Sequence, residues 1–245
     1  MNKDNTISND KLKKLLEISE KENKALLKLA LHDIRSPLNK LFALVGLFKM
    51  SDDPLSEEQA DYLDKMELVI RDGLSRMRNL QDLKAVEEKN IEIFYEPIKV
   101  SKLVKNTIRE QKPDAARKNI EINFAEDSLT LTSDKNSLLR ILDQLLSNAI
   151  KFSPKHSNIS IDLEETESDL LVHITDSGYG ISAEEQKKLF KKFTPLSTRT
   201  TGGESVTGIG LYIASVMANN IGGSISYTNN DNSVFTLSLP RISMV

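Results

Sequence analysis

Two apolar stripes with helical spacing run through residues 29–88, and they limit the possible folds more than any other feature. Their members alternate at spacings of three and four residues, which is typical of helices that pack along a seam. The first stripe comprises Leu31, Ile34, Leu38, Leu41, Val45 and Phe48, and the second comprises Leu63, Met66, Ile70, Gly73, Met77 and Leu80. A hairpin of two such helices cannot bury both stripes alone. We therefore expect two copies to form a four-helix bundle, and hence a homodimer.

The segment "SDDPLSEEQ" separates the two stripes. Pro54 ends the first helix, because proline cannot continue one. Ser56 and Gln59 match a capping box, which predicts the start of the second helix.

The pattern changes after residue 89, where strand and helix signals alternate. We expect strands at 91–100, 120–124, 129–132, 159–165, 170–176, 224–228 and 233–239, with helices at 102–118, 134–152, 182–193 and 209–220. This order predicts one mixed sheet with helices on one face, so that the whole chain is of the α+β class. The Ser/Thr/Gly-rich loop of residues 194–208 is long for a compact domain, which is typical of a functional lid.

Composition excludes several classes of function. The net charge of −3 gives no basic excess to neutralise phosphates, so we expect no nucleic acid partner. The absence of cysteine excludes disulfides and thiolate catalysis. No apolar run reaches the length of a membrane span and the polar N-terminus is no signal peptide, so we expect a soluble chain or the soluble part of a longer one.

The stretch "LALHDIRSPLNKL" places His32 and Pro37 inside the first helix. Leu31 and Ile34 anchor the helix while His32 faces outward, and a neutral imidazole is nucleophilic near pH 7. Pro37 cannot donate a hydrogen bond to the carbonyl of Asp33, and we expect it to bend and loosen this turn at a cost of about 3 kcal/mol. The alternative for His32 is a solvent-exposed helical histidine without a role.

Three further segments are typical of ligand sites. "DSGYG" ends a strand with Asp176 and continues with two glycines, which allows close approach of a ligand or forms a simple Asx-type turn. "TGIGLYIA" starts a helix with glycines, which suits a phosphate or is a plain helix start. "LLSNAIKFSP" places Asn148 among apolar residues, where its amide oxygen can bind Mg²⁺ or pair with a backbone carbonyl.

"HDIRSPLN", "LLSNAIKFSP", "DSGYGIS", "LFKKF" and "TGIGLYIA" together resemble, in order, the H, N, G1, F and G2 boxes of sensor histidine kinases. The resemblance covers the chain from about residue 20 onward. It implies a signal helix (1–28), a helical hairpin for dimerisation and histidine phosphotransfer (29–88), and an ATP-binding α/β sandwich of the Bergerat type (89–245) with a lid near 194–207.

The resemblance also implies a role for each matching residue. His32 is the phosphoacceptor, Asp33 its base or orienting group, and Asp176 the partner of the adenine amine. Asn148 binds Mg²⁺ and Lys151 lies near the phosphates of ATP. The remaining nucleotide-binding residues are Gly178, Gly180, Ile181, Phe193, Thr207, Gly208, Gly210 and Leu211.

Three positions depart from the family pattern. Gln144 stands where a first asparagine is usual, which keeps an amide near the Mg²⁺ site. Val206 replaces a glycine at the start of the last box, and a β-branched residue resists positive φ. Ser36 stands where many members carry Thr or Asn to orient a water for dephosphorylation of a partner.

The sequence therefore predicts a protein-histidine kinase that transfers a phosphoryl group from Mg-ATP to His32, and then to an aspartate of a response-regulator receiver domain. We expect it in the cytoplasm, as a whole protein or as the cytosolic part of a longer sensor. Two alternatives are an ATP-binding scaffold without stable phosphohistidine and a serine kinase or ATPase of the same nucleotide fold.

Overall fold

The computed structural model describes residues 9–51, 54–88, 91–125, 129–194, 197, 200–202, 206–230 and 232–241. Contacts between residues divide the chain into two units, Met1–Gln81 and Asp82–Val245. In the described part of the chain, no helix has both the length and the apolar character that a bilayer span requires.

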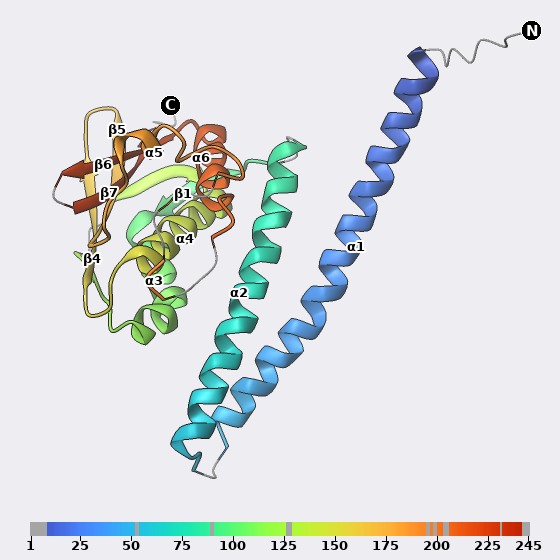
Figure 1. Cartoon of the computed structure of the whole chain (residues 1–245). Helices are drawn as coiled ribbons and strands as arrows, with labels where there is room; N and C mark the ends of the chain where they lie inside the picture. Colours follow the sequence, from blue (N-terminus) through green and yellow to red (C-terminus); the bar gives the residue numbers. More distant parts are fainter. Residues whose placement is uncertain are drawn as a thin grey trace, which may run out of the picture. The chain divides into compact units, whose positions relative to one another are not determined.

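The first unit contains the long helix α1 (Asn9–Lys49) and most of α2 (Glu57–Glu87), whose last turns belong to the second unit (Figure 1). The predicted capping box is confirmed: Gln59 N–H donates to Ser56 Oγ (3.2 Å), and Ser56 N–H donates to Gln59 Oε1 (2.9 Å). Helix α1 continues through Pro37. Near the turn, Lys49 Nζ reaches Asp64 (2.7 Å) and Glu67 (2.5 Å), which ties the two helices together.

Only part of each apolar stripe is buried within this hairpin. Leu31 and Val45 of α1 are buried, as are Ile70 and Met77 of α2. Other large apolar side chains of the two helices stay exposed, namely Ile34, Leu41, Leu44, Leu47, Phe48, Met66 and Val69. A single hairpin thus leaves a second apolar face uncovered.

The second unit contains a five-stranded mixed sheet in the order β2-β4-β5-β7-β6. Its strands are β2 (Glu121–Phe124), β4 (Asn158–Glu165), β5 (Asp169–Asp176), β6 (Ser224–Asn230) and β7 (Asn232–Pro240). Strands β2 and β4 are parallel, and the other neighbours are antiparallel. The predicted mixed sheet is confirmed.

Helices α3 (Val100–Arg117), α4 (Lys135–Phe152) and α6 (Gly210–Asn220) lie on one face of this sheet (Figure 1). Alternate residues of β4, β5 and β7 face these helices, and they form one apolar core with the buried side of α4. This agrees with the predicted layering of helices on a single face.

The expectation of one sheet was incomplete, because β1 (Tyr95–Lys99) and β3 (Thr130–Asp134) form a separate antiparallel pair. Pro97 cannot donate a ladder hydrogen bond, so β1 suits an edge position. Ile98 is the one buried residue of β1, whereas a strand of the main sheet buries every second residue.

Helix α5 (Ala183–Gln186) is also shorter than the predicted helix, which was to end near Phe193. Ser182 caps it as expected and accepts a hydrogen bond from Glu185 N–H (3.4 Å). The following segment places lysines at 187 and 191 and at 188 and 192. Like charges four residues apart destabilise a helix, so the chain continues in turns.

Asp134 connects β3, α4 and the segment before β1, and its replacement should destabilise the second unit. The buried carboxylate accepts from Ser137 N–H (2.7 Å) and Phe94 N–H (3.0 Å). Burial opposes ionisation, but these hydrogen bonds hold the pKa of Asp134 below its ordinary value. We expect Asp134→Ala to lower the unfolding free energy by about 1–3 kcal/mol in urea denaturation at pH 7.

A depressed pKa adds stability above the unfolded-state value, and this stability is lost as pH falls through the folded-state value. The difference between wild type and Asp134→Ala should therefore shrink below pH 4. Asp134→Asn keeps a capping oxygen and should fall between the two proteins. Equal denaturation midpoints for wild type and Asp134→Ala at pH 7 would contradict this account.

Candidate functional site

Helix α4 forms the centre of the candidate site, since the two glycine-rich segments contact it at different heights. The turn after β5 approaches its carboxyl end, where a Cβ at Gly178 would lie 3.3 Å from the carbonyl oxygen of Phe152. The first residue of α6 lies two turns earlier, where a Cβ at Gly210 would overlap Gln144 Oε1. A side chain at Gly178 would overlap Asp176 Oδ1 and crowd the end of α4, and one at Gly210 would push the Gln144 amide aside.

Asp176 is the buried charged group of this site. It is the last residue of β5 and only 3% exposed. Burial raises the pKa of Asp176 to about 6, although hydrogen bonds from Gly178 N–H (2.8 Å) and the Ser233 hydroxyl partly oppose the shift. A carboxylate with so few partners, at the end of a central strand, is suited to accept a hydrogen bond from a ligand.

The turn after Asp176 is held by residues of β6. Gly180 has a φ of +72°, and a Cβ there would lie 2.5 Å from Asn229 Nδ2. Ile181 N–H donates to Tyr227 Oη (3.0 Å), which in turn lies 3.3 Å from Ser233 Oγ. The backbone of the "DSGYG" turn is therefore fixed on both sides of Gly180.

The polar residues of α4 lie along one edge of this helix, and its other side packs into the apolar core. Gln144 is buried, whereas Asn148 and Lys151 are partly exposed. An amide oxygen is a suitable ligand for Mg²⁺, which prefers oxygen and usually shares its coordination with phosphates. Within the described ranges, no group of three or more His, Cys, Asp or Glu side chains could hold a metal ion. A cation at Asn148 would therefore need most of its ligands from a bound nucleotide and water.

The amino end of α6 has the backbone donors that every helix start presents. Its N-cap residue Ile209 makes no side-chain capping bond, and such a helix start suits an anion. Gly208 has a φ of +65° and packs against the backbone of Thr194, where a Cβ would lie 2.9 Å away.

The remaining predicted residues of this unit lie around α6 and the lid. Ile181, Thr207 and Leu211 are partly buried, and Ile181 and Leu211 pack against the core. Phe193 has a φ of +55° and is exposed. In the predicted lid, residues 195–196, 198–199 and 203–205 lie outside the described part of the chain.

His32, Asp33 and Ser36 lie on α1 in the first unit. The side chain of His32 is 81% exposed, and its Nδ1 lies 3.3 Å from Asp33 Oδ1. Adjacent helical side chains rarely face each other, yet this rotamer brings the pair into contact. Buried Leu31 anchors the same turn, and Arg35 donates to Gln81 Oε1 of α2 (2.5 Å). Ser36 is exposed one turn after His32.

The fold thus brings Gln144, Asp176, Gly178 and Gly210 together around α4, while the histidine belongs to the other unit. The sequence reasoning missed the residues that support the site from β6 and β7, namely Tyr227, Asn229 and Ser233. Ser233 is the register partner of Asp176 across β5 and β7. Its proximity depends on strand pairing over 57 residues of sequence separation, and alternation within β7 gave the only hint.

Comparison with known proteins gives a family for the larger part of the second unit. Residues 133–243 match the family "Histidine kinase-, DNA gyrase B-, and HSP90-like ATPase". Sensor protein GacS of Pseudomonas syringae pv. syringae is 28% identical over 236 residues, covering 93% of this chain and 26% of that protein. Aerobic respiration control sensor protein ArcB of Escherichia coli K12 is 27% identical over 233 residues, covering 91% and 29%. The chain thus spans about a quarter of the length of these relatives.

Solved structures show the same fold. Histidine kinase AdeS of Acinetobacter baumannii matches with a TM-score of 0.60 and 22% identity, covering 86% of this chain and 98% of that one. Full-length ShkA, in a complex with AMPPNP, matches with a TM-score of 0.64 and 20% identity, covering 90% and 47%.

Asp176→Asn should remove a pH-dependent cost of folding. Because its pKa is raised, the ionised carboxylate destabilises the folded protein, and this loss grows as pH rises from 4 through 6. Asparagine keeps an acceptor for Gly178 N–H but carries no charge. We expect the variant to gain stability over wild type by up to about 3 kcal/mol at pH 8 and little at pH 4, measured by urea denaturation without nucleotide.

Asp162→Asn, at an exposed position of β4, is the matched control and should follow the wild-type pH profile. Parallel profiles for wild type and Asp176→Asn would show that the carboxyl group ionises at its ordinary pKa.

Proposed function

We propose that the chain is a kinase core that phosphorylates His32 from Mg-ATP, because residues 133–243 match a histidine-kinase-like ATPase family and sensor kinases are similar to most of the chain. We further propose that it passes the phosphoryl group to an aspartate of a response-regulator receiver domain. The observation that carries the proposal is the exposed imidazole of His32, with one ring nitrogen against a carboxylate and the other open to a substrate.

In this proposal the second unit binds the nucleotide. Asp176 accepts the hydrogen bond of the adenine amine. Its burial at a strand end, with few partners, supports this role. The first N–H groups of α6 bind phosphate oxygens, with Gly208 and Gly210 allowing close approach. Lys151 adds positive charge near the phosphates, and Gln144 holds the start of α6 by its contact with Gly210.

Asn148 is the proposed protein ligand of Mg²⁺. The donor chemistry fits, because an amide oxygen is a hard ligand and the cation shares its coordination sphere with phosphate. The bound cation supplies neutralisation of phosphate charge. Phe193, Thr207, Ile181 and Leu211 complete the proposed pocket around the nucleotide.

The phosphoryl transfer uses the tautomer of His32 that its contact with Asp33 favours. With the proton on Nδ1 directed at Asp33 Oδ1, the lone pair of Nε2 is free to attack the γ-phosphorus. The N–P bond forms as the bond from phosphorus to the β–γ bridging oxygen breaks, and ADP leaves. The product imidazolium can then release its Nδ1 proton to Asp33.

Later transfer to a receiver aspartate returns the imidazole to its starting state. Ser36, one turn from His32, is the proposed position for a water that dephosphorylates the partner. Pro37 removes one backbone hydrogen bond in the same turn, and we propose that this turn flexes when the kinase unit approaches.

We also propose that the chain acts as a homodimer in the cytoplasm, where ATP is available. The exposed apolar side chains of α1 and α2 support the dimer, since a second hairpin would cover them in a four-helix bundle. The proposed parts remain the signal helix at 1–28, the phosphotransfer hairpin at 29–88 and the catalytic domain from residue 89. Helix α1 runs without a break across the first of these boundaries.

Incubation with γ-labelled ATP and Mg²⁺ tests the kinase assignment. Wild type should acquire an acid-labile, alkali-stable label, and His32→Ala should acquire none, because the acceptor nitrogen is gone. Asp33→Asn should be labelled about 100-fold more slowly, since the asparagine cannot take the proton.

His156→Asn is the matched control, because His156 has a φ of +60°, a conformation that asparagine tolerates, and should be labelled like wild type. Acid-stable label would favour the serine kinase. ATP binding without any label would favour the scaffold.

The dimer has its own test in Leu41→Glu. Leu41 is exposed on the hairpin, and a charge there would be buried in the bundle at a high cost. Sedimentation equilibrium should show a dimer for wild type and for the neighbouring control Lys40→Glu, but a monomer for Leu41→Glu. A wild-type monomer over the micromolar range would contradict the proposal.

A further inference from the structure

Lys118 is a buried cation outside the residues that the family resemblance assigns. It follows α3 directly and is 4% exposed, although lysine is rarely buried unless its charge is paired. Its backbone is fixed by the end of α3, where its N–H donates to Ala115 O and its carbonyl accepts from His156 N–H (2.9 Å). The side chain therefore starts from a rigid point.

The ammonium of Lys118 has an oxygen acceptor for each of its three protons. Two are backbone carbonyls in the last turn of α4, Ile150 O (2.7 Å) and Lys151 O (2.8 Å). The last carbonyls of a helix have no partner within it and carry partial negative charge, so they stabilise a cation. The third acceptor is Thr201 Oγ1 (2.8 Å).

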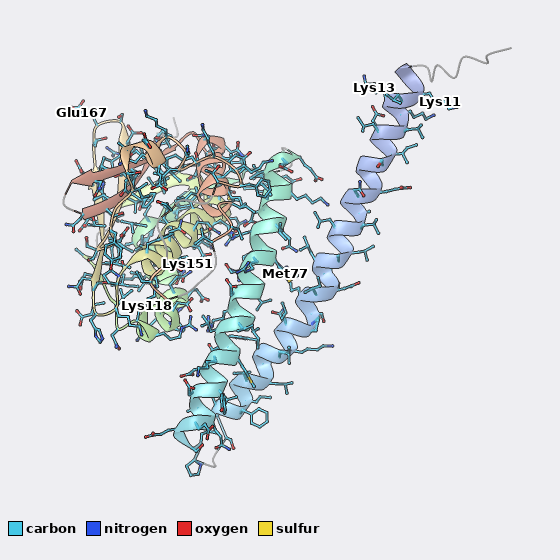
Figure 2. The ribbon with its side chains drawn as sticks, viewed as in Figure 1. Lys11, Lys13, Met77, Lys118, Lys151 and Glu167 are labelled. Atoms are coloured by element: carbon cyan, nitrogen blue, oxygen red, sulfur yellow. The ribbon has the colours of Figure 1, made fainter. Side chains whose placement is uncertain are left out.

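Thr201 lies within the proposed lid and is bonded to the same end of α4. Its backbone N–H donates to Lys151 O (3.0 Å), and its hydroxyl proton can go to Ser153 O or to Lys151 O. Figure 2 shows Lys118 and Lys151 on the second unit, and the bond from Lys118 Nζ to Lys151 O places them side by side. Ser197, earlier in the lid, donates its N–H to Glu185 Oε1 (2.6 Å).

We infer that Lys118 and Thr201 are positioning residues that fix the lid to the helix carrying Asn148 and Lys151. The bonds run from a rigid turn, through the ammonium, to both the helix end and the lid. They hold Thr201 at the carboxyl end of α4, the helix that carries Asn148 and Lys151. We call the bonds among Lys118, Thr201 and the end of α4 the lid anchor. Its expected effect on ATP rests on the proposed function, whereas its effect on the lid can be measured without any nucleotide.

The consequence for nucleotide binding follows from the geometry. Because Thr201 is held at the end of the helix that is proposed to bind the nucleotide, the anchoring bonds should slow the departure of a bound nucleotide. Loss of the Thr201 hydroxyl breaks the bonds to Lys118 and Ser153 O but leaves the backbone bond to Lys151 O in place. The dissociation rate should rise while the pocket residues stay unchanged.

The test compares Thr201→Val with Thr201→Ser in the full chain. Valine has nearly the shape of threonine and no hydroxyl, whereas serine keeps it. Because the chain contains no cysteine, Ser197→Cys gives a unique site in the lid for a fluorophore. Without nucleotide, the label should have lower anisotropy in Thr201→Val than in Thr201→Ser or in the labelled parent.

A fluorescent ATP analogue, chased with excess ATP, gives the second readout. It should leave Thr201→Val about tenfold faster than wild type, and Thr201→Ser at nearly the wild-type rate. Lys118→Met should resemble Thr201→Val, and the double variant should be no faster than either alone, because both changes break one set of bonds.

Thr166→Val is the structural control. Its hydroxyl accepts from Asp169 N–H (2.9 Å) in the turn between β4 and β5, so its loss should lower the melting temperature without changing the dissociation rate. Equal anisotropy and equal dissociation rates for Thr201→Val and Thr201→Ser would overturn the anchor. If wild type fails to bind the analogue, the proposed function fails, and the anisotropy comparison alone decides the anchor.

Discussion

The burial of one side of α4 is the interaction on which the second unit depends. Leu138, Ile141, Leu145 and Leu146 are fully buried against the sheet and α6, and they fix both the height and the rotation of the helix. Rotation matters because the polar edge with Asn148 and Lys151 lies beside this buried side. A well-packed core therefore sets the direction of the polar groups on α4.

The same helix also explains why the site has glycines where it does. A Cβ at Gly178 would overlap Asp176 Oδ1 and approach Phe152 O of α4 to 3.3 Å, and a Cβ at Gly210 would overlap Gln144 Oε1 of α4. At Gly180 and Gly208 a second requirement applies, because their positive φ values are strained for other residues. Glycine is thus favoured by close packing at Gly178 and Gly210, and by backbone conformation at Gly180 and Gly208.

Much of this architecture was predictable from local patterns. Helix α4 was placed within one residue, because a strong apolar periodicity follows an aspartate suited to the N-cap. Strand pairs β4–β5 and β6–β7 followed from alternation. The separate β1–β3 pair was missed because no local signal tells which sheet a short strand joins. The short α5 was missed because four lysines outweighed an otherwise helical pattern.

What the sequence could not give were contacts between distant elements at the site. Sequence rules place lysine at the surface, so they point away from Lys118 as a buried group. Only the fold shows that its ammonium meets the end of α4 and Thr201. A sequence motif identifies the residues that contact a ligand. The residues that hold such a motif in place depend on how distant elements pack, and a motif does not reveal them. In this chain, α4 joins the two sets, since its carboxyl end anchors the lid and its polar edge faces the proposed nucleotide.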